Sequence, residues 1–302
     1  MSQIQAFVNY LSAEKRFSKH TVIAYQKDLE QFSDFLEQYF ELKNVVQANR
    51  DHIRSWVVYQ VEKQLGEKTI NRKISTLKSF YKYLLKSEVI NVIPTNDIAT
   101  PKLKKKLPQY IPREDMSRLL DDTQFPHDFE GVRDKLVIEL LYCTGIRSSE
   151  LMELTITNVR FNDSSIKVLG KRKKERIIPL TLELNNKLKT YVFKERNEIA
   201  VENNPYLFVT IKGKQIYHGL LYKIVNKYLS LVSRHAKKSP HVLRHTFATH
   251  MLNNGADLNG IKTLLGHTSL AATQIYTHNS IEQLKSIHKQ AHPRGGHKNR
   301  ED

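Results

Sequence analysis

The sequence predicts a mainly α-helical protein of two domains, the second of which contains a small antiparallel β-sheet. Apolar residues recur every three or four positions along most of the chain, which is the period of a helix. The 302 residues include only 11 glycines and 9 prolines, so few positions favour turns. Alternation of apolar and polar residues, which is typical of strands, occurs around residues 165–180.

A bundle of four helices is predicted for residues 1–95. Each helix has apolar residues on one face, and Ser18 is a suitable N-cap for the second helix. Aromatic residues are frequent on these faces, which favours a packed core over a surface for stacking bases. Arg72, Lys73 and Lys78 lie on or near the polar side of the fourth helix, as candidates either for phosphate contact or for a solvated face. The apolar positions of the four helices, in order, are Ile4, Phe7, Val8 and Leu11; Val22, Tyr25, Leu29, Phe32, Phe35 and Leu36; Ile53, Trp56 and Val57; and Ile70, Ile74, Leu77, Tyr81 and Leu84.

A basic linker is predicted for residues 96–110. Pro94 and Pro101 resist a continuous helix, and the mutual repulsion of the lysines keeps the segment extended. Lys104, Lys105 and Lys106 are therefore candidate DNA contacts. Such a linker suits two domains that close around a duplex, and the alternative is a linker that is merely soluble.

Residues 111–302 predict a helix-rich domain with a β-hairpin. Strands at 165–169 and 176–180 flank a basic loop that contains Lys171, Arg172, Lys173 and Lys174. Another helix begins after Ser148 or Ser149, and Tyr206–Thr210 has the pattern of a short strand. Further helices are predicted at 113–122, 130–143, 182–199, 218–235, 242–253, 257–265 and about 280–290, the last from the apolar stripe Ile281, Leu284 and Ile287.

The balance of charge favours a polyanionic partner. The formal net charge is +17, which suits DNA, RNA or an anionic membrane surface, and the alternative is a basic protein without such a partner. The single cysteine, Cys143, excludes an intrachain disulfide and a thiolate zinc cluster. It fits a reducing cytoplasm, as does an N-terminus without the pattern of a signal peptide. No segment approaches the roughly 20 apolar residues that span a bilayer.

The sequence lacks the usual apparatus of ATP-driven or metal-assisted phosphoryl chemistry. It contains no GxxxxGK[ST] loop and no HExxH motif. The adjacent acidic pairs Glu114-Asp115 and Asp121-Asp122 lie on a predicted helix, where neighbouring side chains diverge, and the third pair is Glu301-Asp302. His241 and His245 at i, i+4 could bind zinc, but no further ligand set is evident. We therefore expect neither a metal nor another cofactor.

A different set of polar residues is present in the second half. His241 and Arg244 share one face of a predicted helix, Arg147 lies in a tight turn before another helix, and Lys171 opens the basic loop. His267 follows Gly266, a plausible helix C-cap, and Tyr276 follows nine residues later. Each residue alone is weak support for a site, but the combination is specific.

With these motifs the sequence resembles the tyrosine site-specific recombinases of the phage-integrase family, and within them the Xer type. The resemblance covers nearly the whole chain and includes Thr-Gly-Ile-Arg147, Gly-Lys171, His241-Val-Leu-Arg244-His, Leu-Gly-His267 and Tyr276-Thr-His. The gaps between the six central residues are 24, 70, 3, 23 and 9, similar to those of the family. The loop after Gly170 is more basic than the Gly-Asn versions expected of the family, which makes Lys173 a rival to Lys171 as the catalytic lysine.

The resemblance implies a SAM-like core-DNA-binding domain at 1–95, a linker at 96–110 and a catalytic domain at 111–302. It also implies that the helix at about 280–290 contacts a neighbouring subunit in a tetramer on two duplexes, while docking on its own domain is the alternative. A paralogous recombinase and an activating DNA translocase are further implied partners. The implied role is resolution of chromosome or plasmid dimers in the cytoplasm. Integration of a mobile element is an alternative with the same chemistry, and a non-catalytic architectural DNA-binding protein is an alternative of another class.

The residues also suit the chemistry of the family on physical grounds. Tyr276 would attack a DNA phosphodiester, form a 3′-phosphotyrosine and free a 5′-hydroxyl, so the bond energy is retained without ATP. Two guanidiniums, Arg147 and Arg244, can stabilise charge on the non-bridging oxygens in place of a metal. Lys171 is the candidate acid for the leaving group. His241 can act as acid/base or orient the tyrosine, and His267 can hydrogen-bond the phosphate.

Overall fold

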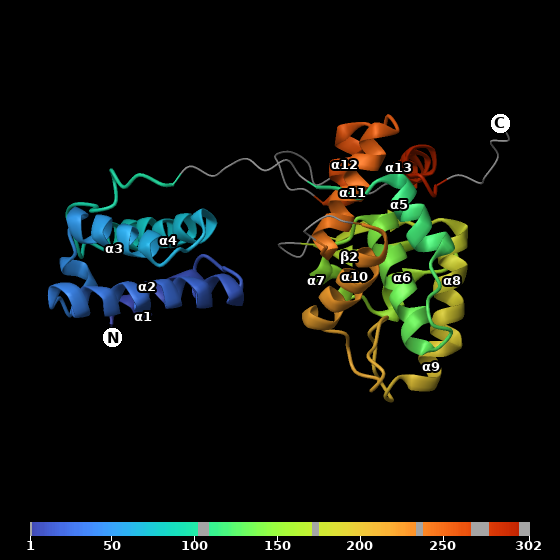
Figure 1. Cartoon of the computed structure of the whole chain (residues 1–302), viewed down its shortest axis with the longest axis horizontal. Coiled ribbons are helices and arrows are strands. Elements are labelled where there is room, and N and C mark those ends of the chain that lie inside the picture. Colours follow the sequence, from blue (N-terminus) through green and yellow to red (C-terminus); the bar gives the residue numbers. More distant parts are fainter. Residues whose placement is uncertain (1, 102–108, 171–174, 234–237, 267–277, 296–302) are drawn as a thin grey trace. The chain divides into compact units, whose positions relative to one another are not determined.

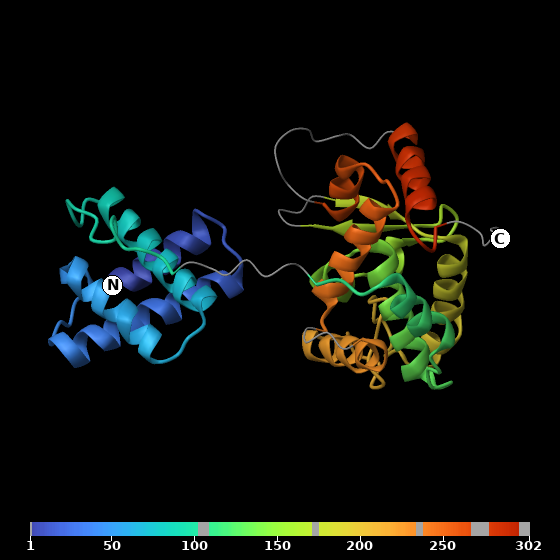
Figure 2. The same ribbon diagram turned by 45° about the horizontal axis from the view of Figure 1, so that its top comes forward.

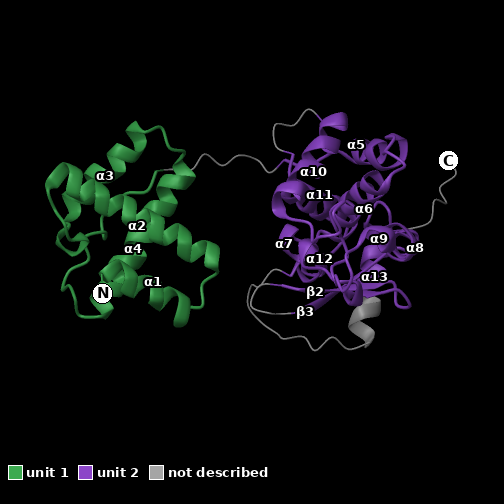
Figure 3. Cartoon of the chain, turned by 90° about the horizontal axis from the view of Figure 1, so that it is seen from below, with its two compact units in different colours: residues 1–106 green, residues 107–302 purple. Residues whose placement is uncertain are grey.

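The computed structural model of the chain contains two compact units, residues 1–106 and 107–302 (Figure 3). It describes residues 2–101, 109–170, 175–233, 238–266 and 278–295, and only the backbone of 278–283. Both units are mainly helical, and the second contains a three-stranded antiparallel sheet, which confirms the predicted fold class. Among the described helices, none has both the length and the apolar character needed to cross a membrane.

Unit 1 is a two-layered helical bundle, with α1 and α2 in one layer and α3 and α4 in the other (Figure 1). Ser2 and Ser18 cap α1 and α2, and Asn49 caps α3, because their side chains accept the first free backbone N–H groups of these helices. The elements are α1 (Gln3–Ala13), α2 (Lys19–Phe40), the 3₁₀ turn η1 (Val45–Gln47), α3 (Arg50–Glu62) and α4 (Glu67–Lys86).

The aromatic stripe predicted from the sequence is the core of unit 1. Phe7, Phe32, Trp56 and Tyr81 are fully buried, and the rings of Phe32 and Trp56 meet edge to face with 5.0 Å between centroids. This geometry is a preferred one for aromatic pairs. The prediction that these residues pack together, instead of forming a base-stacking surface, is confirmed.

Unit 2 is organised around the buried helix α6 (Phe129–Thr144), which lies between α11 and α8 (Figure 1). Strand β2 (Ser165–Leu169) pairs with β1 (Val159–Arg160) on one side and β3 (Glu175–Pro179) on the other. The remaining elements are α5 (Arg113–Ser117), the π-helical turn η2 (Arg118–Asp122), α7 (Ser148–Met152), the 3₁₀ turn η3 (Ile156–Asn158), α8 (Leu182–Phe193), α9 (Glu195–Ile199), α10 (His218–Val232), α11 (Pro240–Asn253), α12 (Leu258–Leu265) and α13 (His278–Ala291).

Two predicted elements of unit 2 were wrong in detail. The expected helix at 182–199 breaks at Lys194, whose ψ of −81° departs from a helix, and the break turns Arg196 inward to donate to Tyr206 O and Asn204 O. The expected strand at 206–210 forms only isolated bridges. Its backbone hydrogen-bonds to residues outside the sheet, for example from Leu207 N to Leu154 O at 2.7 Å.

The C-terminal helix α13 docks on its own unit. It packs on β3, α11 and α12 (Figure 2). Leu284 is buried in the core of unit 2. Two buried histidines hold it to the end of α6: His288 Nε2 lies 2.7 Å from Cys143 O, and His292 Nε2 lies 3.3 Å from Tyr142 O. The resemblance implied contact with a neighbouring subunit, with docking on its own domain as the alternative, and in this structure α13 docks on its own domain.

Candidate active site

The site begins at the turn between α6 and α7, where a glycine is required on two counts. Gly145 has φ +59°, in the left-handed region that side chains disfavour. A Cβ atom there would lie 2.5 Å from Cδ1 of Phe247 and 2.8 Å from Cδ2 of Leu265. The turn therefore lets α6 approach α11 and α12 closely, and the carbonyl of Gly145 accepts a hydrogen bond from Arg244 (Nη1 to O, 2.6 Å).

Arg147 follows this turn and is held by a carboxylate one turn further on. Glu150 Oε2 accepts the backbone N–H of Arg147 at 2.9 Å, and Oε1 accepts its Nη1 at 2.7 Å. The Nη2 atom of Arg147 donates to Gly266 O at 3.1 Å. The side chain of Arg147 is still 30% exposed, so the guanidinium is both oriented and accessible to a ligand.

Glu150 is ionised deep in the protein. Burial alone would raise its pKa, but hydrogen bonds and charge from Arg176, together with the bonds from Arg147, lower the pKa to about 2. The carboxylate is therefore a permanent anion at neutral pH, and it fixes both arginines.

Arg244 lies on α11 and converges with Arg147 on the end of α12. Its guanidinium donates to Gly145 O and to Leu265 O (Nη2 to O, 2.7 Å). Burial, followed by the charges of Arg147 and Arg176, lowers the pKa of Arg244 to about 10, so the group stays cationic at neutral pH. His241 lies one turn earlier on α11 and is exposed.

The structure thus brings Arg147 and Arg244 together at the end of α12, where they donate to Gly266 O and Leu265 O, and places His241 on the helix that carries Arg244. The other predicted catalytic residues, Lys171, His267 and Tyr276, and the rival Lys173 lie outside the described residues. So do the candidate DNA contacts Lys104, Lys105, Lys106, Arg172 and Lys174.

All three DNA contacts predicted in unit 1 have partners within the unit. Lys73 is buried, and its Nζ lies 3.3 Å from Oδ1 of Asp28 and also donates to Gln31, so its placement on the polar side of α4 was wrong. Arg72 is exposed but pairs with the same carboxylate. Asp28 is buried on α2, and a buried anion requires such cations. Lys78 is partly buried, and its Nζ donates to Ile98 O at 3.3 Å.

Comparison with known proteins shows the family. Residues 109–283 match the model of the phage integrase family, and residues 4–88 match its N-terminal SAM-like domain. The chain belongs to the phage integrase family. Its curated relatives include the tyrosine recombinase XerC of Pelotomaculum thermopropionicum, which is 36% identical and aligns with 96% of this chain and 98% of the relative. That of Staphylococcus aureus is 37% identical, with 99% of each chain covered.

Solved structures agree with this assignment. The XerH site-specific recombinase bound to difH substrate, in a pre-cleavage complex, is 26% identical with a TM-score of 0.64, covering 88% of this chain and 79% of that one. The Tn1549 transposon integrase in complex with transposon right end DNA is 20% identical with a TM-score of 0.71 over 94% and 98% of the two chains, which supports the fold. The chain is therefore a tyrosine-type site-specific recombinase.

Two residues that shape the recombinase site were not predicted from the sequence. Glu150 and Arg176 form a buried ion pair with two hydrogen bonds, Nη1 to Oε1 at 2.9 Å and Nη2 to Oε2 at 2.8 Å. The spacing of Glu150 three residues after Arg147 is a local signal that could have identified it. Arg176 has no comparable signal, because its partners are distant in the chain.

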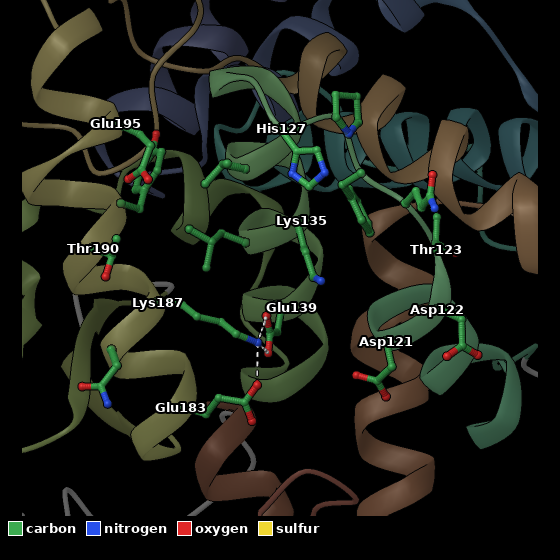
Figure 4. A pocket seen from close by; sticks show the side chains of 18 residues that line it. Asp121, Asp122, Thr123, His127, Lys135, Glu139, Glu183, Lys187, Thr190 and Glu195 are labelled. Carbon is green, nitrogen blue, oxygen red and sulfur yellow. Dashed lines mark hydrogen bonds and ion pairs between the residues drawn. The ribbon is translucent and has the colours of Figure 1, made fainter.

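A cavity of about 950 Å³ elsewhere in the recombinase is unsuited to the same chemistry (Figure 4). It lies beside α6 and α8, and neither Arg147 nor Arg244 lines it. Its wall includes Glu139, which accepts from Lys187 Nζ at 3.0 Å, and Lys187 also pairs with Glu183 (Figure 4). The carboxylates that line it would repel a phosphate, and they are Asp121, Asp122, Glu139, Glu183 and Glu195.

Proposed function

We propose that this recombinase exchanges DNA strands by transesterification, with Tyr276 as the nucleophile. The tyrosine oxygen bonds to the scissile phosphorus, the bond from phosphorus to the 5′ oxygen breaks, and that oxygen leaves as a hydroxyl after gaining a proton. The 5′-hydroxyl of a partner strand then attacks the phosphotyrosine, and repetition on the second pair of strands passes through a Holliday junction. The number of phosphodiester bonds is conserved, so neither ATP nor net hydrolysis is required.

The observation that carries this proposal is the convergence of Arg147 and Arg244 at the end of α12. Arg147 and Arg176 share the single carboxylate of Glu150, and Arg244 adds a third guanidinium nearby, so the site has an excess of positive charge. A transition state that gathers negative charge on phosphate oxygens is stabilised by such fixed cations. This arrangement supplies the electrostatic role that a divalent metal has in other phosphoryl-transfer enzymes.

The remaining roles are assigned by chemistry and by the family resemblance. Lys171 protonates the leaving 5′ oxygen, with Lys173 as the alternative. His241 acts as acid/base or orients the hydroxyl of Tyr276, and its exposed position on the first turn of α11 leaves it accessible to DNA. His267 hydrogen-bonds the phosphate. No cofactor is invoked.

We further propose a specific duplex DNA site as the substrate and dimer resolution in the cytoplasm as the role. The names of the curated relatives support an Xer role, and integration of a mobile element is the alternative with the same active site. Assembly as a homo- or hetero-tetramer on two duplexes, with a paralogous recombinase or a DNA translocase as further partners, belongs to this proposal. The mass of the complex on DNA, measured by sedimentation, tests the tetramer.

A nicked suicide duplex tests the chemistry. Incubated in EDTA, the native protein should form a covalent adduct with DNA, and Tyr276→Phe should not. Tyr217→Phe, a change at an exposed tyrosine of unit 2, is the matched control and should leave the adduct intact. Absence of the adduct with the native protein, combined with retained DNA binding, would favour an architectural protein instead.

A second substrate separates the two lysines. A duplex with sulfur in place of the 5′ bridging oxygen has a leaving group that needs little protonation. Cleavage of this duplex should be restored in Lys171→Ala and not in Lys173→Ala. The opposite pattern would assign the acid to Lys173.

A further inference from the structure

Arg176 is a buried arginine on β3 whose guanidinium bridges two other elements. The residue is 4% exposed. Its Nη1 and Nη2 donate to the two oxygens of Glu150 on α7, and its Nε donates to Leu264 O at the end of α12, at 2.7 Å. Arg176 thereby connects the sheet to α7 and to the end of α12, whose acceptor groups bind Arg147 and Arg244.

The last turn of α12 is held by three arginines at three successive carbonyls. Leu264 O accepts from Arg176, Leu265 O accepts from Arg244, and Gly266 O accepts from Arg147. These C-terminal carbonyls lack partners within a helix and carry partial negative charge, so cations are the favoured donors. Arg147 and Arg244 are therefore oriented against a turn that Arg176 fixes from the sheet.

Glu150 provides the second connection. Its carboxylate is shared between Arg176, which contacts both oxygens, and Arg147, which contacts both through its backbone N–H and Nη1. If Arg176 were removed, the whole charge of Glu150 would act on Arg147. The guanidinium of Arg147 would then be neutralised, and its attraction for a phosphate would fall.

The geometry excludes a lysine as an equivalent residue. Arg176 uses a planar fork toward Glu150 and a third donor, Nε, toward Leu264, whereas an ammonium is a single point charge. The side chain also lies against Gly266, where an added Cβ would be 3.1 Å from both Cδ and Nη1 of Arg176. Gly266 is followed by the family motif residue His267.

We propose that Arg176 is a positioning residue for strand transfer, which fixes Glu150 and the end of α12 so that Arg147 and Arg244 present uncompensated positive charge to the scissile phosphate. The inference rests on the proposed function. Arg176 is buried and acts through its neighbours, so it contacts no DNA itself.

The test compares two suicide duplexes under single-turnover conditions. One has an ordinary scissile phosphodiester, and the other has a methylphosphonate, in which a neutral methyl group replaces the charged oxygen. Arg176→Met should slow adduct formation on the phosphodiester by about 10- to 100-fold, a typical effect of misplaced catalytic groups. The deficit should be much smaller on the methylphosphonate, because this substrate depends less on the two arginines.

Arg196→Met is the matched control. Arg196 is also a buried arginine of unit 2 that donates to two backbone carbonyls, but it lies away from the site. A purely structural loss should lower the activity on both duplexes equally, as expected for Arg196→Met. Arg176→Lys, which keeps the charge and approximate size, should remain slow on the phosphodiester and provides the test if Arg176→Met does not fold.

The outcomes separate the two proposals. A native protein that forms no adduct contradicts the proposed function. A native protein that forms the adduct, with Arg176→Lys as fast as the native protein or with equal deficits on both duplexes, overturns the positioning role.

Discussion

Replacement of Glu150 by glutamine should destabilise unit 2 in a manner that depends on pH. The folded protein lowers the pKa of this carboxyl from 4.5 to about 2. Each pKa unit corresponds to about 1.4 kcal/mol, so the ionised carboxylate contributes about 3 kcal/mol to the free energy of unfolding at neutral pH. For a unit of this size, Glu150→Gln should lower the melting temperature by about 6–12 °C.

The sign of the pH dependence is fixed by the direction of the shift. Because the folded pKa is depressed, the stabilisation is complete above about pH 4.5 and is lost as the pH falls toward 2. The difference between native protein and Glu150→Gln should therefore be largest at pH 7 and shrink by pH 3. Urea unfolding followed by circular dichroism measures it, with the exposed Glu198→Gln as the control.

Trp56, the single tryptophan, lies in unit 1, so its fluorescence reports that unit separately. The unfolding transition reported by this fluorescence should be the same in the native protein, Glu150→Gln and Glu198→Gln. Equal stability of Glu150→Gln and native protein at pH 7, or a difference that is constant down to pH 3, would refute the account of Glu150 as a buried anion stabilised by two arginines.

Three further outcomes are expected. Gly145→Ala should lower the free energy of unfolding, measured in urea, by about 2–4 kcal/mol, because of left-handed strain and contact with Phe247. The loss should be smaller in Gly255→Ala, where φ is +81° but no atom lies within 4 Å of the new Cβ. Burial lowers the pKa of His288 and His292, so the docking of α13 should weaken as pH falls below about 6.5. The amides of 284–292 should have lower protection factors, which are exchange rates corrected for the intrinsic effect of pH, at pH 5.5 than at 7.5, and equal protection factors would contradict this. Arg244→Ala should slow adduct formation by about 10²–10³-fold, and a near-native rate would remove it from the catalytic set.

The sequence predicted those parts of the fold that depend on local pattern. The helical period and the caps located α2 from Ser18, and alternation located β2 and β3. The burial of Lys73 was missed because Asp28, its partner, lies on another helix, and no local pattern reveals a buried carboxylate across a bundle. The break in the helix at Lys194 was missed for the same reason, because the carbonyls to which Arg196 donates come close to it only in the folded unit.

The same distinction applies to the site. Arg147, His241 and Arg244 were predicted from motifs, and the structure adds how Arg147 and Arg244 are held. The contribution of Arg176 arises from contacts with α7 and α12 that are far from it in the chain, so spacing could not reveal it. Periodicity predicts which residues are buried, whereas the sharing of one carboxylate by two guanidiniums is a property of the tertiary structure.

The turn held by three arginines also bears on when conformational freedom is lost. An arginine side chain has about 2 kcal/mol of rotamer entropy. In Arg147, Arg176 and Arg244 much of this freedom is lost when unit 2 folds, because each guanidinium is already hydrogen-bonded to the end of α12. A phosphate therefore meets side chains that are already ordered, and the entropic penalty of arranging them falls on the folding of unit 2.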